Sequence, residues 1–313
     1  MFSFENAPRL CRALAAGAAL VSGLFAATGV ASAQAQPADY SDVEAAPALW
    51  LITDEDSQVY VFGTFHILPA SLDWKTDEVM SALAASDTLY LETDSHSPEA
   101  QAQMQVLVQQ YGLNPPGVTL SSLLDDETRT LLAEFAPTVG AAPAMLEPMR
   151  PWLAEIVLML GQVQALGFDP SAGVEIALIR EIEGTDTAFG YFETPEEQIG
   201  FLAGMSDAVQ VEALAQGIRD AESMPAEIDG MVRAWATGDM DALDAYVNSD
   251  MREDAPELYE TLIVERNQNW VPLVEDILDG SGTAFIAVGA AHLPGEQGLV
   301  SLMREEGYTV TRQ

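Results

Sequence analysis

Two segments near opposite ends of this chain share one pattern: an apolar strand, a glycine, two small or apolar residues, and a histidine. The first runs from Val59 to His66 and the second from Thr283 to His292, and a Leu-Pro pair follows each histidine closely. A glycine at the end of a strand lets the backbone turn sharply, so we expect each histidine at the carboxyl edge of a sheet, facing a crevice. A helical pattern then begins after each unit. This succession of strand, turn and helix is typical of α/β folds.

The predicted fold class is α/β, with a small mixed β-sheet that carries the two strand-Gly-x-x-His-helix units and a large helical insertion. Apolar runs at 48–53 and 58–63, separated by four polar residues, indicate a hairpin. A short buried strand at 88–92 ends in Glu92, and a strand at 186–192 leads to Glu193, with Thr194 as the cap of the next helix. Further helices are expected over 71–85, 152–166, 225–236, 240–248, 256–278 and 295–306, followed by a terminal strand over 308–312.

The N-terminal segment at 1–33 has the pattern of a signal peptide. Arg9 and Arg12 precede an apolar run, and Ala31-Ser32-Ala33 is a small-residue cleavage site. We therefore expect cleavage after Ala33 and a periplasmic or secreted protein, with an uncleaved signal anchor as the alternative. A flexible lead-in at 34–47 and one α/β domain at 48–313 follow, with a helical middle at about 98–278. No later segment approaches the roughly 18 apolar residues of a membrane span, so no stable membrane insertion is expected after signal removal.

Charge and cysteine content exclude several classes of partner and site. The chain has 12 Lys and Arg against 49 Asp and Glu, a net charge of −37. Such a field repels nucleic acid, so no nucleic-acid partner is expected. The single cysteine, Cys11, lies in the predicted signal peptide. A thiolate nucleophile and a cysteine-rich zinc site are therefore excluded for the mature chain.

His66 and His292 are the leading candidates for metal ligands, because imidazole is the commonest ligand of transition metals in proteins. An open site with three protein ligands usually adds a carboxylate, and Glu92 is the best third ligand because its strand follows the first histidine unit. Asp94 is the reserve. The alternatives are histidines that bond only to backbone carbonyls and a Glu92 that caps a loop. The remaining histidine, His96, lies in a polar loop and is expected to be exposed.

Glu193 and Arg266 are the candidates for catalysis. Glu193 ends a predicted strand and suits a metal ligand, a general base or a group that orients a ligand. Arg266 lies within an amphipathic helix, where it would hold a substrate carboxylate or oxyanion, or pair with a buried acid. The sequence has no G-x-S-x-G elbow, H-E-x-x-H helix, Walker loop or G-x-G-x-x-G fingerprint.

The ordered set of motifs resembles the TraB/GumN family, which includes the Tiki metalloproteases and is similar to the ChaN and erythromycin-esterase group. The resemblance spans the mature chain from Trp50 to the C-terminus. One departure is Glu175, which stands where many relatives have an aspartate. Glutamate is one methylene longer, so any contact made there would be displaced, and Glu175 is not expected to be a site residue. The resemblance is carried by the segments Val59–Pro69, Leu89–Glu92, Arg150–Trp152, Gly173–Glu175, Phe192–Gln198, Trp235 with Gly238–Asp239, Glu265–Asn267 with Trp270, and Val288–Leu293.

The family's proposed activity is metal-dependent peptide hydrolysis centred on two G-x-x-H motifs and acidic residues. The resemblance implies an exported hydrolase of peptide or amide bonds in which His66, His292 and Glu92 bind one divalent ion, with Glu193 as base or support. Mn²⁺, Co²⁺ and Zn²⁺ all suit a set of nitrogen and oxygen ligands. The expected partner is a peptide or small-molecule substrate. Two alternatives stay open: a non-catalytic protein that binds haem or metal, and an accessory factor in exported polysaccharide biosynthesis.

Overall fold

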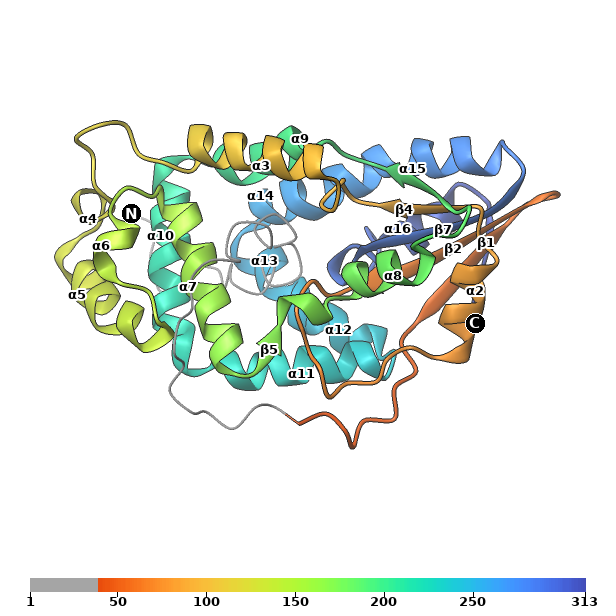
Figure 1. Ribbon diagram of the computed structural model, residues 1–313, viewed down its shortest axis with the longest axis horizontal. Coiled ribbons are helices and arrows are strands. Elements are labelled where there is room, and N and C mark those ends of the chain that lie inside the picture. Colours follow the sequence, from red (N-terminus) through yellow and green to blue (C-terminus); the bar gives the residue numbers. More distant parts are fainter. Residues whose placement is uncertain (1–38) are drawn as a thin grey trace.

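The computed structural model describes residues 39–313, so the predicted signal peptide at 1–33 lies outside the described part. The strands are β1 (Leu49–Thr53), β2 (Ser57–Thr64), β3 (Leu68–Pro69), β4 (Thr88–Leu91), β5 (Phe168–Asp169), β6 (Ala188–Tyr191), β7 (Gly282–Gly289) and β8 (Thr309–Arg312). One sheet orders its strands β6-β4-β7-β2-β1-β8 (Figure 1). β6, β4, β7 and β2 are parallel, whereas β1 pairs antiparallel with β2 and with β8. The sheet is mixed, and the predicted α/β class is confirmed.

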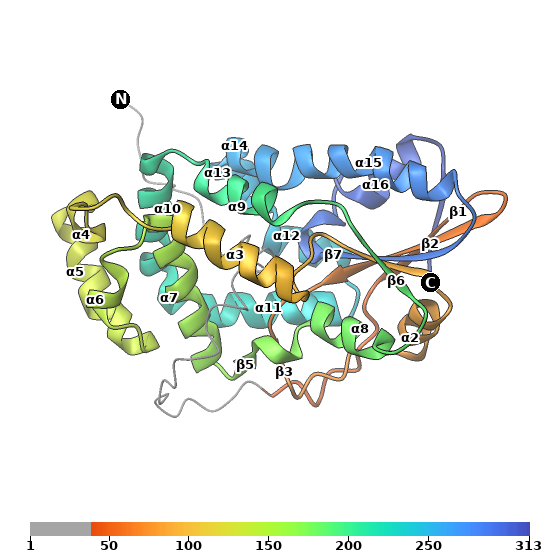
Figure 2. The ribbon, with the colours of Figure 1, turned by 45° about the horizontal axis from the view of Figure 1, so that its top comes forward.

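Helices α3 to α15 lie between β4 and β7 in the chain, interrupted by β5 and β6, and α4 to α7 lie far from the sheet (Figures 1 and 2). A π-helical turn, Glu260–Val264, joins α14 to α15, so the helix predicted over 256–278 is continuous but not regular. Within residues 39–313, no helix has the length and apolar character needed to cross a membrane. The helices are α2 (Asp77–Ala84), α3 (Pro98–Tyr111), α4 (Leu120–Leu123), α5 (Asp126–Phe135), α6 (Pro143–Leu146), α7 (Pro151–Ala165), α8 (Val174–Ile182), α9 (Pro195–Ala203), α10 (Asp207–Arg219), α11 (Met224–Ala236), α12 (Met240–Val247), α13 (Ser249–Asp254), α14 (Pro256–Tyr259), α15 (Glu265–Leu278) and α16 (Leu299–Glu305).

Two predicted helices are shorter in the structure. The helix expected over 71–85 begins only at Asp77, because the Thr76 side chain accepts a hydrogen bond from the Val79 backbone N–H and caps the helix there. The helix expected over 295–306 begins at Leu299, after Gly295 adopts a positive φ of 82° that a helix does not allow. The histidine units therefore continue into loops before their helices start.

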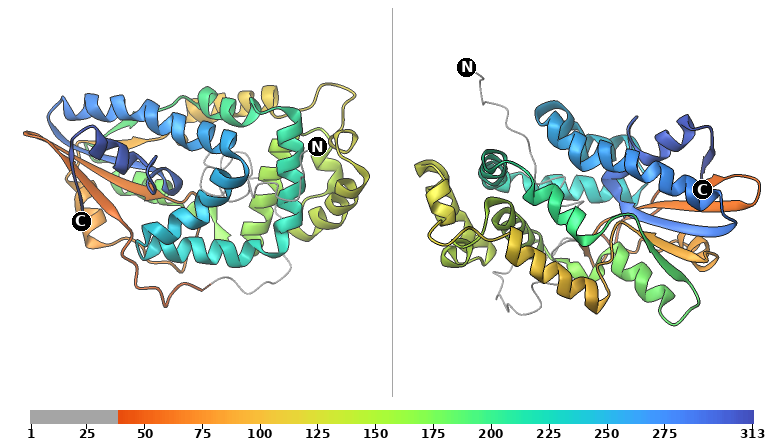
Figure 3. Two further views of the ribbon diagram at one scale, coloured as in Figure 1. Left: turned by 180° about the vertical axis from the view of Figure 1, so that it is seen from behind. Right: turned by 90° about the horizontal axis from the view of Figure 1, so that it is seen from above.

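Helices cover both faces of the sheet (Figure 3). On one face, α15 and α16 form a hydrophobic cluster with Val61 and Ile286. On the other face, Phe62 and Phe285 belong to the cluster that includes α2 and α8. Successive residues of a strand point to opposite faces, so a strand covered on both sides is apolar at nearly every position. This arrangement explains the continuous apolar runs of β2 and β7.

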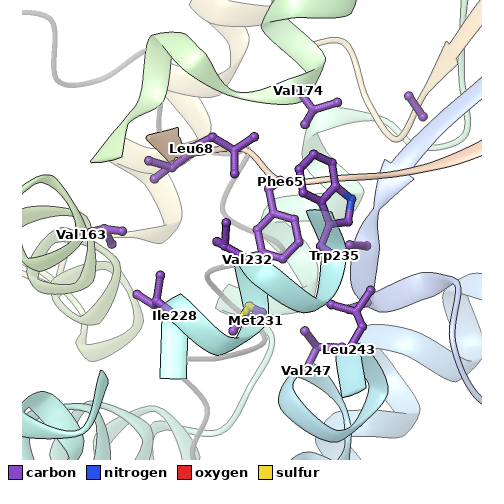
Figure 4. Close-up of a cluster of buried hydrophobic side chains, with 14 of the residues drawn as sticks. Phe65, Leu68, Val163, Val174, Ile228, Met231, Val232, Trp235, Leu243 and Val247 are labelled. Atoms are coloured by element: carbon purple, nitrogen blue, oxygen red, sulfur yellow. The ribbon is translucent and has the colours of Figure 1, made fainter. Parts of the chain in front are cut away.

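The turn between β2 and His66 is held by contacts from distant parts of the chain. The Trp235 indole N–H donates a hydrogen bond to the Gly63 carbonyl at 2.8 Å. The Trp235 ring also packs beside that of Phe65 (Figure 4), and the two ring centroids are 5.5 Å apart. The backbone N–H of Val174, at the start of α8, donates to the Phe65 carbonyl at 2.9 Å. The position of His66 is therefore fixed by α11 and α8 as well as by its own strand.

The end of the predicted lead-in packs on the domain. Tyr40 is buried, and its ring lies 6.1 Å from that of Phe168 in β5. The backbone N–H of Ala46 donates to the Ala236 carbonyl at 2.7 Å. β5 in turn pairs with β3, which begins two residues after His66. The Leu-Pro pair after His66 thus forms a short strand.

Candidate metal and catalytic site

Each of the four parallel strands is followed within three residues by a candidate site residue: His66 after β2, Glu92 after β4, Glu193 after β6 and His292 after β7. Parallel strands end at the same edge of the sheet, so these side chains meet there. The strand order places them in the sequence Glu193, Glu92, His292 and His66 across the edge. The predicted edge position is therefore correct.

The histidines do not face an open crevice, as the sequence had suggested. His66 is 6% exposed, His292 3% and Glu92 7%, which means that their polar atoms need partners within the protein. The reason is that α9 and α15 deliver further polar side chains to this edge. The edge of the sheet carries a buried polar cluster, which we call the charged cluster: Glu92, Glu193, Arg266, His292, His66, Gln198 and Asn267.

Arg266, in the first turn of α15, lies at the centre of the charged cluster. Its Nε donates to Glu193 Oε1 at 2.7 Å and its Nη2 to Glu193 Oε2 at 2.9 Å, which is the bidentate geometry that guanidinium and carboxylate favour. The same Nη2 donates to Glu92 Oε2 at 2.6 Å. Gln198, in α9, donates to both carboxylates at 3.1 Å. Of the two roles left open for Arg266, the structure shows the pairing with buried acids.

The two carboxylates differ in their proton affinity. Burial would raise the pKa of Glu92, but Arg266, His292 and His66 outweigh burial and lower it to about 2. The Gly289 backbone N–H, which donates to Glu92 Oε1 at 2.6 Å, acts in the same direction. For Glu193, burial raises the pKa and the nearby Arg266 offsets only part of this effect. Glu92 is thus held ionised, and Glu193 is the carboxylate that takes up a proton first.

The hydrogen bonds of His292 define its tautomer. Asn267 Nδ2 donates to the carbonyls of His292 and Gln297 at 3.0 and 2.7 Å, so its Oδ1 faces His292 Nδ1 at 2.8 Å and must accept from it. Nδ1 therefore carries the hydrogen, and the lone pair lies on Nε2, which is 3.0 Å from Arg266 Nη1. Burial and the charge of Arg266 lower the pKa of His292 to about 3, so this ring is neutral at pH 7.

His66 has a similar arrangement with a different partner. Its Nδ1 lies 2.6 Å from Glu175 Oε1, which also accepts from the Thr64 hydroxyl. Burial would lower the pKa of His66, but the charge and hydrogen bond of Glu175 outweigh it and raise the pKa. Its Nε2 is buried without a hydrogen-bond partner among residues 39–313. Glu175 can reach the ring because the backbone of Gly173 packs directly on the His66 carbonyl, where a Cβ would overlap.

The two rings suit a metal ion in one respect. A histidine that binds a metal usually donates its other ring N–H to an oxygen, and both His66 and His292 do so through Nδ1. Both oxygens of Glu92 are engaged by Arg266, Gln198 and Gly289, however. Among the described residues, no group of three or more His, Cys, Asp or Glu stands ready to hold a metal ion. The Nε2 of His66 therefore fits a cation as it stands, whereas His292 Nε2 and Glu92 would both first have to part from Arg266.

Two other predicted roles are not supported by the contacts. Asp94, the reserve ligand, accepts hydrogen bonds from the Ser97 hydroxyl at 2.6 Å and from backbone N–H groups of its own loop. His96 is only partly exposed, because its ring packs 4.3 Å from that of Phe189 in β6. The expectation of an exposed His96 was wrong, since its polar sequence neighbours gave no sign of the aromatic edge strand that covers it.

Glu175, Asn267 and Gln198 belong to the charged cluster or its support but were not among the predicted site residues. Gln198 could have been found, because Pro195 opens α9 and the fourth helical residue lies in the first turn, beside the strand end that carries Glu193. Asn267 was visible as a polar residue beside Arg266 in an amphipathic helix. Glu175 had been set aside because of its length, yet its carboxylate reaches His66.

Fold and site together define an α/β protein with a buried His, Glu and Arg cluster at the carboxyl edge of its sheet. The chain belongs to the TraB/PrgY/gumN family, whose sequence model matches residues 48–312. It is 20% identical over 261 residues to the uncharacterized protein YbaP of Escherichia coli (strain K12), covering 82% of this chain and 92% of YbaP. It is 23% identical over 304 residues to the metalloprotease TIKI2 of Danio rerio, covering 80% of this chain and 57% of TIKI2. No solved structure matches the chain.

Proposed function

We propose that the protein is an exported hydrolase of peptide or amide bonds that works with one divalent metal ion. The observation that carries this proposal is the pair of buried imidazoles at one sheet edge, each with Nδ1 bonded to a side-chain oxygen. Such rings are fixed in orientation and turn Nε2 towards a further partner. His66 Nε2 has no partner among the described residues, and His292 Nε2 faces Arg266 Nη1, which a bound ion would displace. The similarity to a protein named as a metalloprotease supports the same chemistry.

His66 and His292 would hold the ion through Nε2, with Glu92 as the acidic ligand. The unpartnered Nε2 of His66 is the strongest sign of a missing partner, since buried polar atoms are rarely left without one. When bound, a divalent ion would polarise the scissile carbonyl and make water more acidic. Mn²⁺, Co²⁺ and Zn²⁺ remain the candidates, because all three accept imidazole and carboxylate ligands.

Glu193 would act as the general base. Burial raises its pKa while the pKa of the neighbouring Glu92 is lowered, and such a separation between two acids is typical of acid and base assignments in enzymes. Arg266 would position both carboxylates and keep Glu92 ionised, since it contacts Glu92 and Glu193 at once. In this proposal Arg266 orients the two acids and does not hold a substrate anion.

The test is to measure bound metal and peptide hydrolysis in the purified protein and in matched variants. His66→Ala and His292→Ala should lose the metal and the hydrolysis together, whereas His96→Ala should keep both. Glu193→Gln should keep the metal and lose about 10²- to 10⁴-fold in rate. Unchanged metal content in both histidine variants would reject the ligands. Metal binding without turnover of any peptide would favour a metal-binding protein over a hydrolase.

Export can be tested separately by N-terminal sequencing of the protein recovered from the periplasm or the medium. The proposal expects a chain that begins at Gln34, after removal of the segment ending in Ala31-Ser32-Ala33. An intact Met1 on membrane-bound protein would support the signal anchor instead.

A further inference from the structure

A recess lies next to the charged cluster, between α9 and α10 on one side and α13, α14 and the π-helical turn on the other. Figure 2 shows where these helices lie. Its volume is about 680 Å³, which falls within the roughly 300–1,000 Å³ of typical ligand sites. Phe201, Met205 and Val209 supply apolar surface from one side, and Leu258 does so from the other. The recess is therefore large enough for several side chains of a bound peptide.

Phe201 connects this recess to the charged cluster. Its ring centroid lies 5.2 Å from the guanidinium carbon of Arg266, and the same ring lines the recess. The π-helical turn makes a second connection: Thr261 lines the recess, and the carbonyl of Leu262 accepts a hydrogen bond from Arg266 Nη1 at 3.3 Å. π-Helical turns occur frequently at functional sites. A ligand in the recess would thus lie against the elements that hold Arg266.

The charged residues around the recess are all acidic. Glu212, Asp254 and Glu257 line it, and none of its described lining residues is a lysine or an arginine. Glu212 pairs with Arg219 at 3.2 Å, so Asp254 and Glu257, both exposed, carry most of the local negative charge. The net charge of −37 for the whole chain adds a field that attracts cations. Apolar walls with an acidic rim suit a ligand that has an apolar body and a positive charge.

We infer that this recess binds the segment of a peptide substrate next to the scissile bond and selects segments in which apolar residues alternate with lysine or arginine. The inference rests on the proposed peptide hydrolysis. The apolar side chains would enter between Val209 and Leu258, and the basic side chains would reach Asp254 and Glu257 at the rim. In an extended peptide, successive side chains point in opposite directions, so an alternating sequence presents its apolar side chains to the walls and its basic side chains to the rim.

The test measures binding directly, by fluorescence anisotropy of three labelled octapeptides: alternating leucine and lysine, leucine and glutamate, and serine and lysine. The leucine-lysine peptide should bind at least tenfold more tightly than either of the others. Val209→Trp should weaken its binding at least tenfold, because the larger ring fills the recess at a position that is already 43% exposed. Asp254→Asn combined with Glu257→Gln should weaken binding about fivefold through the loss of two exposed charge pairs.

The matched control is Glu305→Gln combined with Glu306→Gln, which removes two exposed acids from the end of α16 and its cap and should leave binding unchanged. Equal binding of the lysine and glutamate peptides, or equal effects of the two double variants, would overturn the inference. Undiminished binding to Val209→Trp would do the same. Binding that follows the expected pattern without hydrolysis would reject the proposed enzyme but retain the recess. Hydrolysis of peptides that show no such preference in binding would reject the recess as their binding site but retain the proposed enzyme.

Discussion

Replacing Arg266 by methionine tests whether one guanidinium neutralises two buried acids. Methionine keeps the length and apolar stem of the side chain but leaves Glu92 and Glu193 without the cation that contacts both. Removing one partner from a buried ion pair costs roughly 3–5 kcal/mol, because the remaining charge stays buried without compensation. We therefore expect Arg266→Met to lose about that much unfolding free energy at pH 7.

The size of this loss should depend on pH. In the wild type, the pKa of Glu92 is lowered from 4.5 to about 2, so its ionisation stabilises the fold above pH 4.5, and this contribution is lost as the pH falls towards 2. This lowering of the Glu92 pKa corresponds to about 3 kcal/mol of stability, which agrees with the estimate for the buried pair. In Arg266→Met, burial acts on both acids without the cation and raises their pKa values, so the variant loses stability as the pH rises through them. The gap between the two proteins should therefore be widest at pH 7 and smaller at pH 5.

The assay is urea unfolding of metal-free protein at pH 7 and pH 5, with Lys75→Met as the control. Lys75 pairs with Glu181, and both side chains are more than a third exposed, so its loss should cost less than about 1 kcal/mol at either pH. A loss below 1 kcal/mol for Arg266→Met at pH 7 would refute the reasoning. So would a loss that is the same at both pH values.

Three further predictions concern the two histidine turns. Glu175→Gln should lower the pKa of His66 in the metal-free protein, because burial then acts without the opposing carboxylate, and an unchanged value in an NMR titration would contradict this. His292, with a pKa of about 3, should stay neutral from pH 8 to pH 5 in the same experiment. The stability that its neutral form supports should be lost as the pH falls from 6.5 towards 3. A titration midpoint near 6.5 would contradict the assigned burial. Gly173→Ala should destabilise the protein by about 2 kcal/mol or more, since its Cβ would overlap the His66 carbonyl. Gly200→Ala, within α9 and with no atom near the added Cβ, should stabilise it by about 0.5–1 kcal/mol, and similar changes in the two glycine variants would contradict the packing.

The edge of the sheet was predictable because the relevant signals are local. A strand followed by glycine and histidine marks the end of β2 and of β7, and a strand that ends in an acid marks β4 and β6. Parallel strands bring such ends together whatever the order of the strands. His66, His292, Glu92 and Glu193 could therefore be assigned to one edge from the sequence alone, although their order across it could not.

The partners of these residues depend on contacts between distant segments. Arg266 lies 174 residues from Glu92 in the chain, and no periodicity shows that the first turn of α15 meets that strand end. The role of Glu175 depends on the close packing of Gly173 against His66, which a comparison of side-chain lengths does not capture. The charged cluster is buried by these long-range contacts. Because the sequence does not show them, it suggested an open crevice at this edge of the sheet.

The central claim is that His66 and His292 present their Nε2 atoms to one shared metal ion. The most direct measurement is ¹H–¹⁵N NMR of the three histidine rings while Zn²⁺ is added, with His96 as an internal reference. We expect the Nε2 resonances of His66 and His292 to shift together at one equivalent of Zn²⁺, while both Nδ1 atoms stay protonated and His96 is unaffected. Shifts in only one of the two rings, or in His96 alone, would contradict a site shared between the two turns.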